Sequence, residues 1–338
     1  MKLFNRKPAL GIGIGVGFVG AVALALRYGL SRQAREPIPD GISPAIFSTR
    51  VARTGFGEMI YHVSGSGDPL VFLHGVFLGA SSYEWSKVYP RFVIDREVIV
   101  PDLIGFGESE RPSTPMDASD YAEAIAEFLR EVAPGRKPVV VASGLTAGIA
   151  LLMAARHPEL VSRLELFLPT GLKESGKWRA MGMLALSGIP GISGFVYRNY
   201  LARPPFVRGW LARIALADPA SITDEMVAIF VTCARQYGAE HAILGFLRGR
   251  LAFDMHRRLG DVAVPVHVLW PDRATGFPAD GGERVCRKIP RASLESLPGC
   301  GILAALENPD LVADAIGRSL RGDLAGTGAT SSGLPITG

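Results

Sequence analysis

Three residues with side chains able to act in proton-transfer or nucleophilic chemistry lie at or near the ends of apolar runs. They are Ser143 after the run at 139–141, Asp272 after the run at 264–270, and Cys300 in the loop at 297–301. A hydroxyl or thiol at such a place can act as a nucleophile, and a carboxylate can orient the histidine that activates it. The structural alternatives are a hydroxyl bonded to nearby backbone and a thiol that packs as a small apolar group.

The histidines and cysteines indicate neither a metal site nor a disulfide bond. The histidines are His62, His74, His157, His241, His256 and His267, and the cysteines are Cys233, Cys286 and Cys300. No two histidines have the spacing of metal ligands on one helix face. Three cysteines without a C-x-x-C spacing predict neither a zinc site nor a disulfide framework. We therefore predict no metal and no cofactor.

The composition is that of one large globular unit. Hydrophobic residues make up 48% of the 338 residues and charged residues 20%, which is too apolar for a disordered chain. The net charge is +4, but 36 basic residues are interleaved with 32 acidic ones along the whole chain. Because no basic stripe with interleaved aromatic residues is present, we predict no nucleic-acid partner.

An apolar segment near the N-terminus has the length of a membrane span. Residues 9–26 form 18 consecutive apolar or glycine positions between basic flanks. We predict a transmembrane helix at 9–28 that anchors the protein in a membrane as a single-pass signal anchor. A cleaved signal peptide is the alternative, because Ala21, Ala23 and Ala25 offer small-residue cleavage patterns. Three basic residues on each side leave the side of the soluble domain undetermined.

Small residues recur every four positions within this apolar segment. They are Gly13, Gly17, Ala21 and Ala25. Such a stripe lets another transmembrane helix approach closely, which predicts a membrane-protein partner, although bilayer helices also tolerate glycine generally. Gly15, Gly17 and Gly20 match a dinucleotide-binding pattern, but no strand precedes them, so no cofactor follows.

The rest of the chain alternates short apolar strands with helical stretches, which is typical of a parallel α/β sheet. Expected strands lie at 60–63, 69–75, 96–103, 137–142, 163–168, 264–270 and 292–297, and expected helices at 119–132, 146–156, 280–288 and 308–320. The predicted organisation is an N-terminal flank at 1–8, the membrane helix at 9–28, a linker at 29–48, a core at 49–171 and 262–321, a helical cap at 172–261, and a flexible tail at 322–338. The cap would cover the carboxyl edge of the sheet, where open α/β sheets bind ligands.

Five motifs in order together resemble the α/β-hydrolase superfamily, in particular its capped esterase, epoxide-hydrolase and haloalkane-dehalogenase-like branch. They are His74-Gly75, Trp85, the turn from Asp102 to Ser109 (DLIGFGES), Arg156-His157-Pro158-Glu159, and Leu297-Pro298-Gly299-Cys300-Gly301. The resemblance covers about residues 50 to 320. It implies a mostly parallel eight-stranded sheet with helices on both faces and a helical cap insertion.

The resemblance also implies where a catalytic triad would stand. The turn after the strand at 137–142 aligns Gly144 with the nucleophile, because a shift onto Ser143 would put Val141 and Leu145 where small side chains are required. The expected acid is replaced by Ala274, with Asp272 two residues earlier, and the expected histidine by Ile302. All three triad positions are thus predicted to be degenerate.

These positions predict a non-catalytic, membrane-anchored protein that acts as a binding or scaffold subunit or holds a small apolar ligand. The backbone N–H groups of Val76, Phe77 and Leu145 are the residual oxyanion donors implied by the resemblance. The other pocket candidates are His74, Ser143, Thr146, Asp272 and Cys300. The alternative is an active esterase or dehalogenase-like hydrolase that uses Ser143, Asp272 or Cys300 in unorthodox roles.

Overall fold

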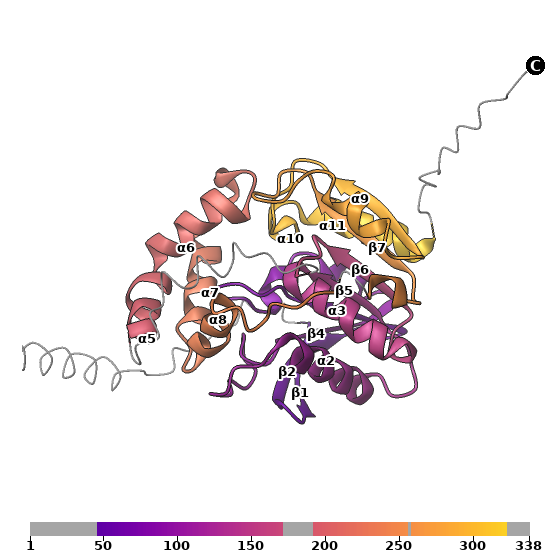
Figure 1. Cartoon of the computed structure of the whole chain (residues 1–338), viewed down its shortest axis with the longest axis horizontal. Helices are drawn as coiled ribbons and strands as arrows, with labels where there is room; N and C mark the ends of the chain where they lie inside the picture. The colour runs from indigo at the N-terminus through magenta and orange to yellow at the C-terminus, as the bar shows by residue number, and fades with distance from the viewer. Residues whose placement is uncertain (1–45, 172–191, 256–257, 323–338) are drawn as a thin grey trace, which may run out of the picture.

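A computed structural model describes residues 46–171, 192–255 and 258–322, which form an eight-stranded sheet with helices on both faces (Figure 1). The strands are β1 (Ser48–Thr54), β2 (Gly57–Ser64), β3 (Asp68–Leu73), β4 (Arg96–Pro101), β5 (Val139–Ser143), β6 (Arg163–Phe167), β7 (Val266–Pro271) and β8 (Ala292–Leu297). Their order across the sheet is β1-β2-β4-β3-β5-β6-β7-β8. Strand β2 is antiparallel to β1 and β4, and the pairs from β4 to β8 are parallel.

Helices cover the sheet because its side chains alternate between two apolar layers. On one face Val140 and Leu164 pack with α2 (Ala118–Val132) and α3 (Gly144–Arg156). On the other face Phe72 packs with α11 (Pro309–Arg321) and two short helices. Those short helices are η2 (Ser82–Trp85) and η3 (Tyr89–Phe92), and the remaining core elements are η4 (Pro158–Leu160), η8 (Leu259–Asp261), α9 (Gly281–Cys286) and α10 (Ala304–Glu307).

The cap consists of helices that enter between β6 and β7. Its described elements are α5 (Ile192–Val196), η5 (Tyr197–Leu201), α6 (Pro204–Trp210), η6 (Leu211–Ala215), η7 (Pro219–Ser221), α7 (Asp224–Ala234) and α8 (Ala239–Leu247). Helices α5 to α8 stand to one side of the sheet in Figure 1. A residue every four positions, Val207, Leu211 and Ala215, is buried and packs in a separate apolar cluster with α7. Because Tyr83, Leu303 and Leu306 belong to the same cluster, the cap packs on the core domain through these side chains.

The predicted α/β-hydrolase fold with an eight-stranded, mostly parallel sheet is confirmed. Strand β1 was not among the expected strands, because its exposed face and polar sequence STRVART give no apolar run. Two expected strands end early: β3 ends at Leu73 and β4 at Pro101, since the chain turns away at this edge.

The predicted membrane helix at 9–28 and all but the first residue of the predicted tail at 322–338 lie outside the described residues. Within the residues that the structure does describe, no helix is both long and apolar enough to cross a bilayer.

Candidate functional site

The chain makes a sharp turn between β5 and α3 at the centre of the sheet. Ser143 ends β5 with extended dihedrals, and Gly144 begins α3 with φ +55°. A side chain rarely adopts that value of φ, but a nucleophile elbow holds its residue in a similarly strained turn. A Cβ atom built on Gly144 would meet no described atom within 4 Å. The turn thus presents a bare backbone position toward open space.

The side chain of Ser143 does not point into the open space beside Gly144. Its hydroxyl is buried and lies 2.9 Å from the place where a Cβ of Gly75 would stand. It also lies near the carboxyl of Glu84, yet no described group meets the full geometry of a hydrogen bond with it. The hydroxyl therefore lies behind the turn, between the strand and the loop that follows β3.

Glu84 is a buried carboxyl at the base of this site. Its Oε2 accepts a hydrogen bond of 2.7 Å from the backbone N–H of Gly75. Burial raises the pKa of Glu84 to about 7, although the nearby Ser143 hydroxyl and the Gly75 N–H both act to lower it. Near neutral pH the Glu84 carboxyl is thus present in both its protonated and its ionised form, next to the predicted oxyanion loop.

The three predicted oxyanion donors lie close to the turn. Val76, Phe77 and Leu145 belong to one apolar cluster, and within the described residues their N–H groups make no hydrogen bond to another group of the chain. The ring of Phe77 stacks on two cap side chains, Trp210 at 5.7 Å and Phe230 at 5.6 Å between ring centroids. Aromatic side chains of the cap thus pack against one of the residues that carry these backbone donors.

The residues at the other two predicted triad positions are apolar. Ala274 is buried in the same cluster as Leu145, and Ile302 packs against it. The loop that carries Ile302 is tied to the cap, because the N–H of Leu303 donates to the carbonyl of Ala215 at 3.0 Å. No described acid or imidazole at these two places could orient a base or move a proton.

Asp272 and Cys300 hold the loop around Ile302 in place. The Asp272 carboxyl accepts a 2.8 Å hydrogen bond from the N–H of Gly299, and the N–H of Arg273 donates to the carbonyl of Cys300 at 3.1 Å. Burial, with the charges of Glu307 and Asp272, raises the pKa of the Cys300 thiol to about 11. A thiol of that pKa is a poor nucleophile at neutral pH.

His74 and Thr146 are buried in the core of the site. The ring of His74 bonds to the carbonyl of Gly75 at 2.8 Å and to the N–H of Leu103 at 3.0 Å. Burial lowers the pKa of His74, against the charge of Asp102. Both ring nitrogens therefore serve the backbone, and the neutral ring is favoured. The Thr146 hydroxyl has no partner among the described groups.

One group of possible metal ligands occurs among the described residues. Atoms of His62, Asp102 and Glu108 lie within 4.8 Å of one another. Both oxygens of Asp102 already accept backbone N–H groups, from Ser82 at 2.6 Å and from Glu108 at 2.7 Å. Burial and the charge of Asp102 raise the pKa of Glu108, against the lowering effects of His62 and the Arg111 guanidinium. These contacts fit a turn held by hydrogen bonds and charge pairing better than a cation site.

Comparison with known families decides the relationship. The alpha/beta hydrolase family is matched over residues 70–315, a range that includes the cap, the turn at Gly144 and the strands from β4 to β8. The chain belongs to the α/β hydrolase family.

Several of its relatives carry the names of hydrolases. This family member is 37% identical over 112 residues to a 2-hydroxymuconate semialdehyde hydrolase from Pseudomonas sp. (strain CF600), an alignment that covers 33% of this chain and 40% of the relative. It is 37% identical over 107 residues to a soluble epoxide hydrolase from Corynebacterium sp. (strain C12), covering 32% and 36% of the two chains. The structure of an epoxide hydrolase superposes with a TM-score of 0.70 at 22% identity, covering 82% of this chain and all of that one.

Glu84 is a residue of this α/β hydrolase family site that the sequence motifs did not indicate. The structure brings Gly144, Leu145, Ala274 and Ile302 to the carboxyl edge with Val76 and Phe77. Glu84 lies in the segment Ser-Tyr-Glu-Trp just before Trp85, which the motif analysis used only as a landmark. An acid flanked by aromatic residues in a short helix was the signal that it is buried.

Proposed function

We propose that this protein is a non-hydrolytic, membrane-anchored member of the α/β hydrolase family that binds a small apolar ligand next to Gly144. The single observation that carries the proposal is the glycine at the tip of the turn, with φ +55° and no described atom within 4 Å of a built Cβ. The turn keeps the geometry that would present a nucleophile but carries none.

A hydrolytic relay needs a nucleophile, a base that accepts its proton, and an acid that holds the base. The three corresponding positions carry a hydrogen atom at Gly144, a methyl group at Ala274 and a branched alkyl group at Ile302. Each loss is in a different segment of the chain, which supports loss of the mechanism as a whole. The buried, high-pKa thiol of Cys300 offers no replacement.

The same site retains groups that suit binding. The N–H groups of Val76, Phe77 and Leu145 can donate to a carbonyl or other acceptor oxygen. Phe77 and its cap neighbours Trp210 and Phe230 supply an apolar, aromatic surface beside those donors. A ligand with one acceptor oxygen and a short apolar body matches this combination.

Rebuilding the relay tests the proposal. We expect the wild-type protein to show no turnover of p-nitrophenyl butyrate and no labelling by a serine-directed phosphonate. Gly144→Ser with Ala274→Asp and Ile302→His should raise ester turnover at least about 100-fold, since a full triad contributes several orders of magnitude. Medium-chain fatty acids should raise the melting temperature of the wild-type protein without being consumed. Saturable ester turnover by the wild-type protein would overturn the proposal.

A scaffold role through the membrane is a part of this proposal that rests on sequence. The stripe of Gly13, Gly17, Ala21 and Ala25 predicts close packing with another transmembrane helix. We expect a partner to remain bound at constant ratio in mild detergent and to be lost on Gly13→Leu with Gly17→Leu. Gly11→Leu is the matched control, because it lies off the stripe.

The second candidate is an active hydrolase on a small apolar substrate, and the names of the relatives favour it. Its chemistry would use the Ser143 hydroxyl with the Glu84 carboxyl, whose pKa of about 7 suits a base near neutral pH. Phosphonate labelling that disappears in Ser143→Ala, and persists in Ser82→Ala, would establish this candidate. The burial of the Ser143 hydroxyl argues against such labelling.

A further inference from the structure

The outer part of the cap exposes large apolar side chains to an unusual degree. Among the described residues, eight large hydrophobic side chains are exposed, and four of them fall within 20 positions of the cap. They are Phe195 (40% exposed), Tyr200 (62%), Phe206 (43%) and Ile214 (43%). The rings of Phe195 and Tyr200 touch edge to face, with centroids 6.5 Å apart. This group is hereafter the cap face.

Arginines accompany these side chains at regular intervals. Residues 192–217 contain Arg198, Arg203, Arg208 and Arg213, five positions apart, and no aspartate or glutamate. Arg198 pairs with Glu240 at 2.7 Å and Arg208 pairs with Asp224, both from later cap helices. Within the described residues Arg203 and Arg213 have no acidic partner. The segment therefore carries unneutralised positive charge beside exposed apolar groups.

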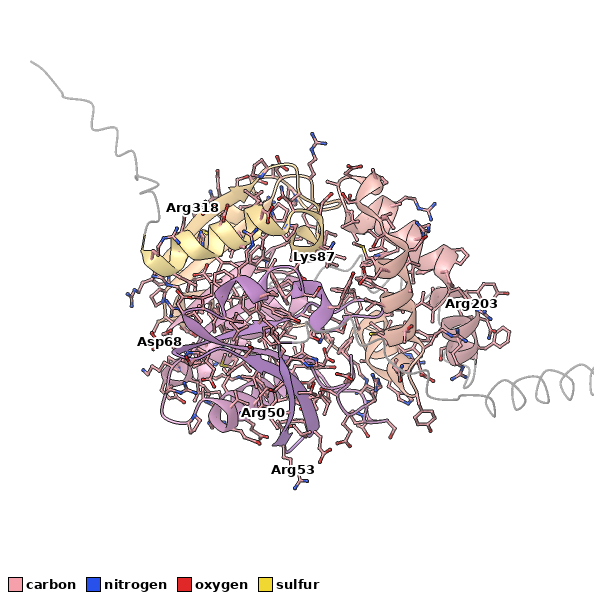
Figure 2. The ribbon with its side chains drawn as sticks, turned by 180° about the vertical axis from the view of Figure 1, so that it is seen from behind. Arg50, Arg53, Asp68, Lys87, Arg203 and Arg318 are labelled. Carbon is pink, nitrogen blue, oxygen red and sulfur yellow. The ribbon has the colours of Figure 1, made fainter. Side chains whose placement is uncertain are left out.

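The packing of α6 and η6 explains why these side chains point outward. Val207 and Leu211 are buried toward α7. Phe206, Arg208 and Arg213 therefore lie on the outer side. Figure 1 places α5 and α6 at the edge of the molecule, away from the sheet, and Figure 2 shows Arg203 at the rim of the cap. No described element covers this side.

We propose that the cap face docks on the surface of an anionic lipid bilayer. Aromatic side chains are stable at the headgroup level, and arginines attract anionic lipids. Exposed aromatic and aliphatic groups with interleaved arginines and no acid have the character of an interfacial helix surface. The predicted span at 9–28 would hold the same chain near a bilayer, so the docking needs little affinity of its own. The proposal does not depend on what Gly144 binds.

Hydrogen–deuterium exchange of the full chain in lipid vesicles tests this docking. The full chain is reconstituted in vesicles of phosphatidylcholine alone and in vesicles with added phosphatidylglycerol. We expect amides of α5, α6 and η6 to exchange more slowly only with phosphatidylglycerol, and this protection to vanish in 0.5 M salt. Arg203→Gln with Arg213→Gln should weaken the docking equilibrium about 25-fold, at about fivefold per arginine.

A matched control changes the same charge elsewhere. Arg50→Gln with Arg53→Gln on β1, whose side chains are exposed outside the cap, should leave the protection unchanged. Equal protection in both kinds of vesicle, or protection that survives the cap variant or is lost in the β1 control, would overturn the proposal. Soluble polyglutamate that protects the same amides without lipid would also overturn it, and would assign the face to an acidic protein. Circular dichroism confirms that each variant is folded.

Discussion

Two regions of the sheet contrast in what they do with acids and histidines. At the carboxyl edge, two of the predicted triad positions carry Ala274 and Ile302, which have neither a carboxylate nor an imidazole. In the interior, Glu165 on β6 and His267 on β7 are direct ladder partners, and Glu295 on β8 lies two residues beyond Ser293, the partner of His267 on that strand. The chain thus has an acid and histidine set, but in the middle of its strands and away from the turn.

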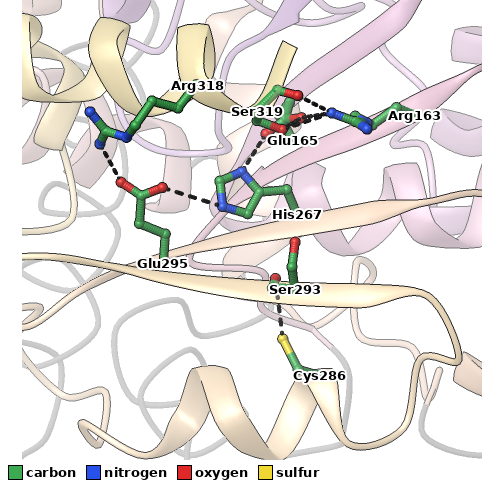
Figure 3. Close-up of polar contacts among 8 residues, drawn as sticks. All are labelled: Arg163, Glu165, His267, Cys286, Ser293, Glu295, Arg318 and Ser319. Carbon is green, nitrogen blue, oxygen red and sulfur yellow. Dashed lines mark hydrogen bonds and ion pairs between the residues drawn. The ribbon is translucent and has the colours of Figure 1, made fainter. Parts of the chain in front are cut away.

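Figure 3 shows how the interior set is closed off. Glu165 contacts the His267 Nδ1 atom at 2.7 Å and accepts a hydrogen bond from the Ser319 hydroxyl. The other ring nitrogen of His267 lies 3.6 Å from Glu295, which pairs with Arg318. Because Arg318 and Ser319 belong to α11, these contacts fasten that helix to the sheet.

The difference teaches that position within the strand, and not residue type, decides the role of these groups. Side chains at strand ends reach ligands, whereas side chains in mid-strand under a helix reach only other parts of the protein. Histidine and glutamate at mid-strand positions under a helix contribute to stability without access to a substrate.

Breaking the interior network should give the largest effect. Glu165→Ala leaves His267 and Ser319 without their buried partner, and we expect a loss of about 3–5 kcal/mol of unfolding free energy in urea titrations. Glu295→Ala, which removes a half-buried acid, should cost about 1 kcal/mol or less. Equal effects of the two substitutions would contradict the contrast between buried and surface pairing.

The pH dependence of stability tests the same contrast near the carboxyl edge, because Glu84 is buried there without a cationic partner among the described residues. Its folded pKa of about 7 lies above the unfolded value, so its contribution is fully present below about pH 4 and is lost as the pH rises through 7. We expect the unfolding free energy of wild type relative to Glu84→Gln to fall by about 3 kcal/mol between pH 4 and pH 8. A pH-independent difference between the two proteins would refute the assignment.

A smaller effect is expected at the turn itself. Gly144→Ser places a side chain at positive φ in open space, and should cost about 1–2 kcal/mol while the protein stays folded. Gly148→Ala in the same helix should cost more, because its Cβ would fall 2.0 Å from the carbonyl oxygen of Thr170. Chemical unfolding of both variants measures the difference, and the reverse order would show that the space at Gly144 is closed.

Thiol reagents should have the smallest effect on the folded protein, because its described thiols are expected to react slowly. Burial raises the pKa of Cys233 to about 12 and that of Cys286 and Cys300 to about 11. At pH 8 the folded protein should therefore react with Ellman's reagent at least about 100-fold more slowly than the protein in urea. Rapid modification that is absent in Cys300→Ser would support a nucleophilic role for the Cys300 thiol near the turn.

The sequence was sufficient for the parallel strands of the sheet, because buried parallel strands are continuous apolar runs. It could not reveal β1, whose residues are polar on the exposed edge. It also assigned His267 only to a buried-looking strand, since its partner Glu165 lies 102 positions away in the chain. Contacts across such separations depend on register, which one sequence does not display.

The open space around Gly144 has an evolutionary consequence. Two of the four glycine codons become serine codons by a single base change, and the new side chain would arrive where no described atom obstructs it. The backbone is already bent as in a nucleophile elbow, so a hydroxyl there would call for little rearrangement of the fold. From either of those two codons, one base change would thus place a hydroxyl at the tip of the turn.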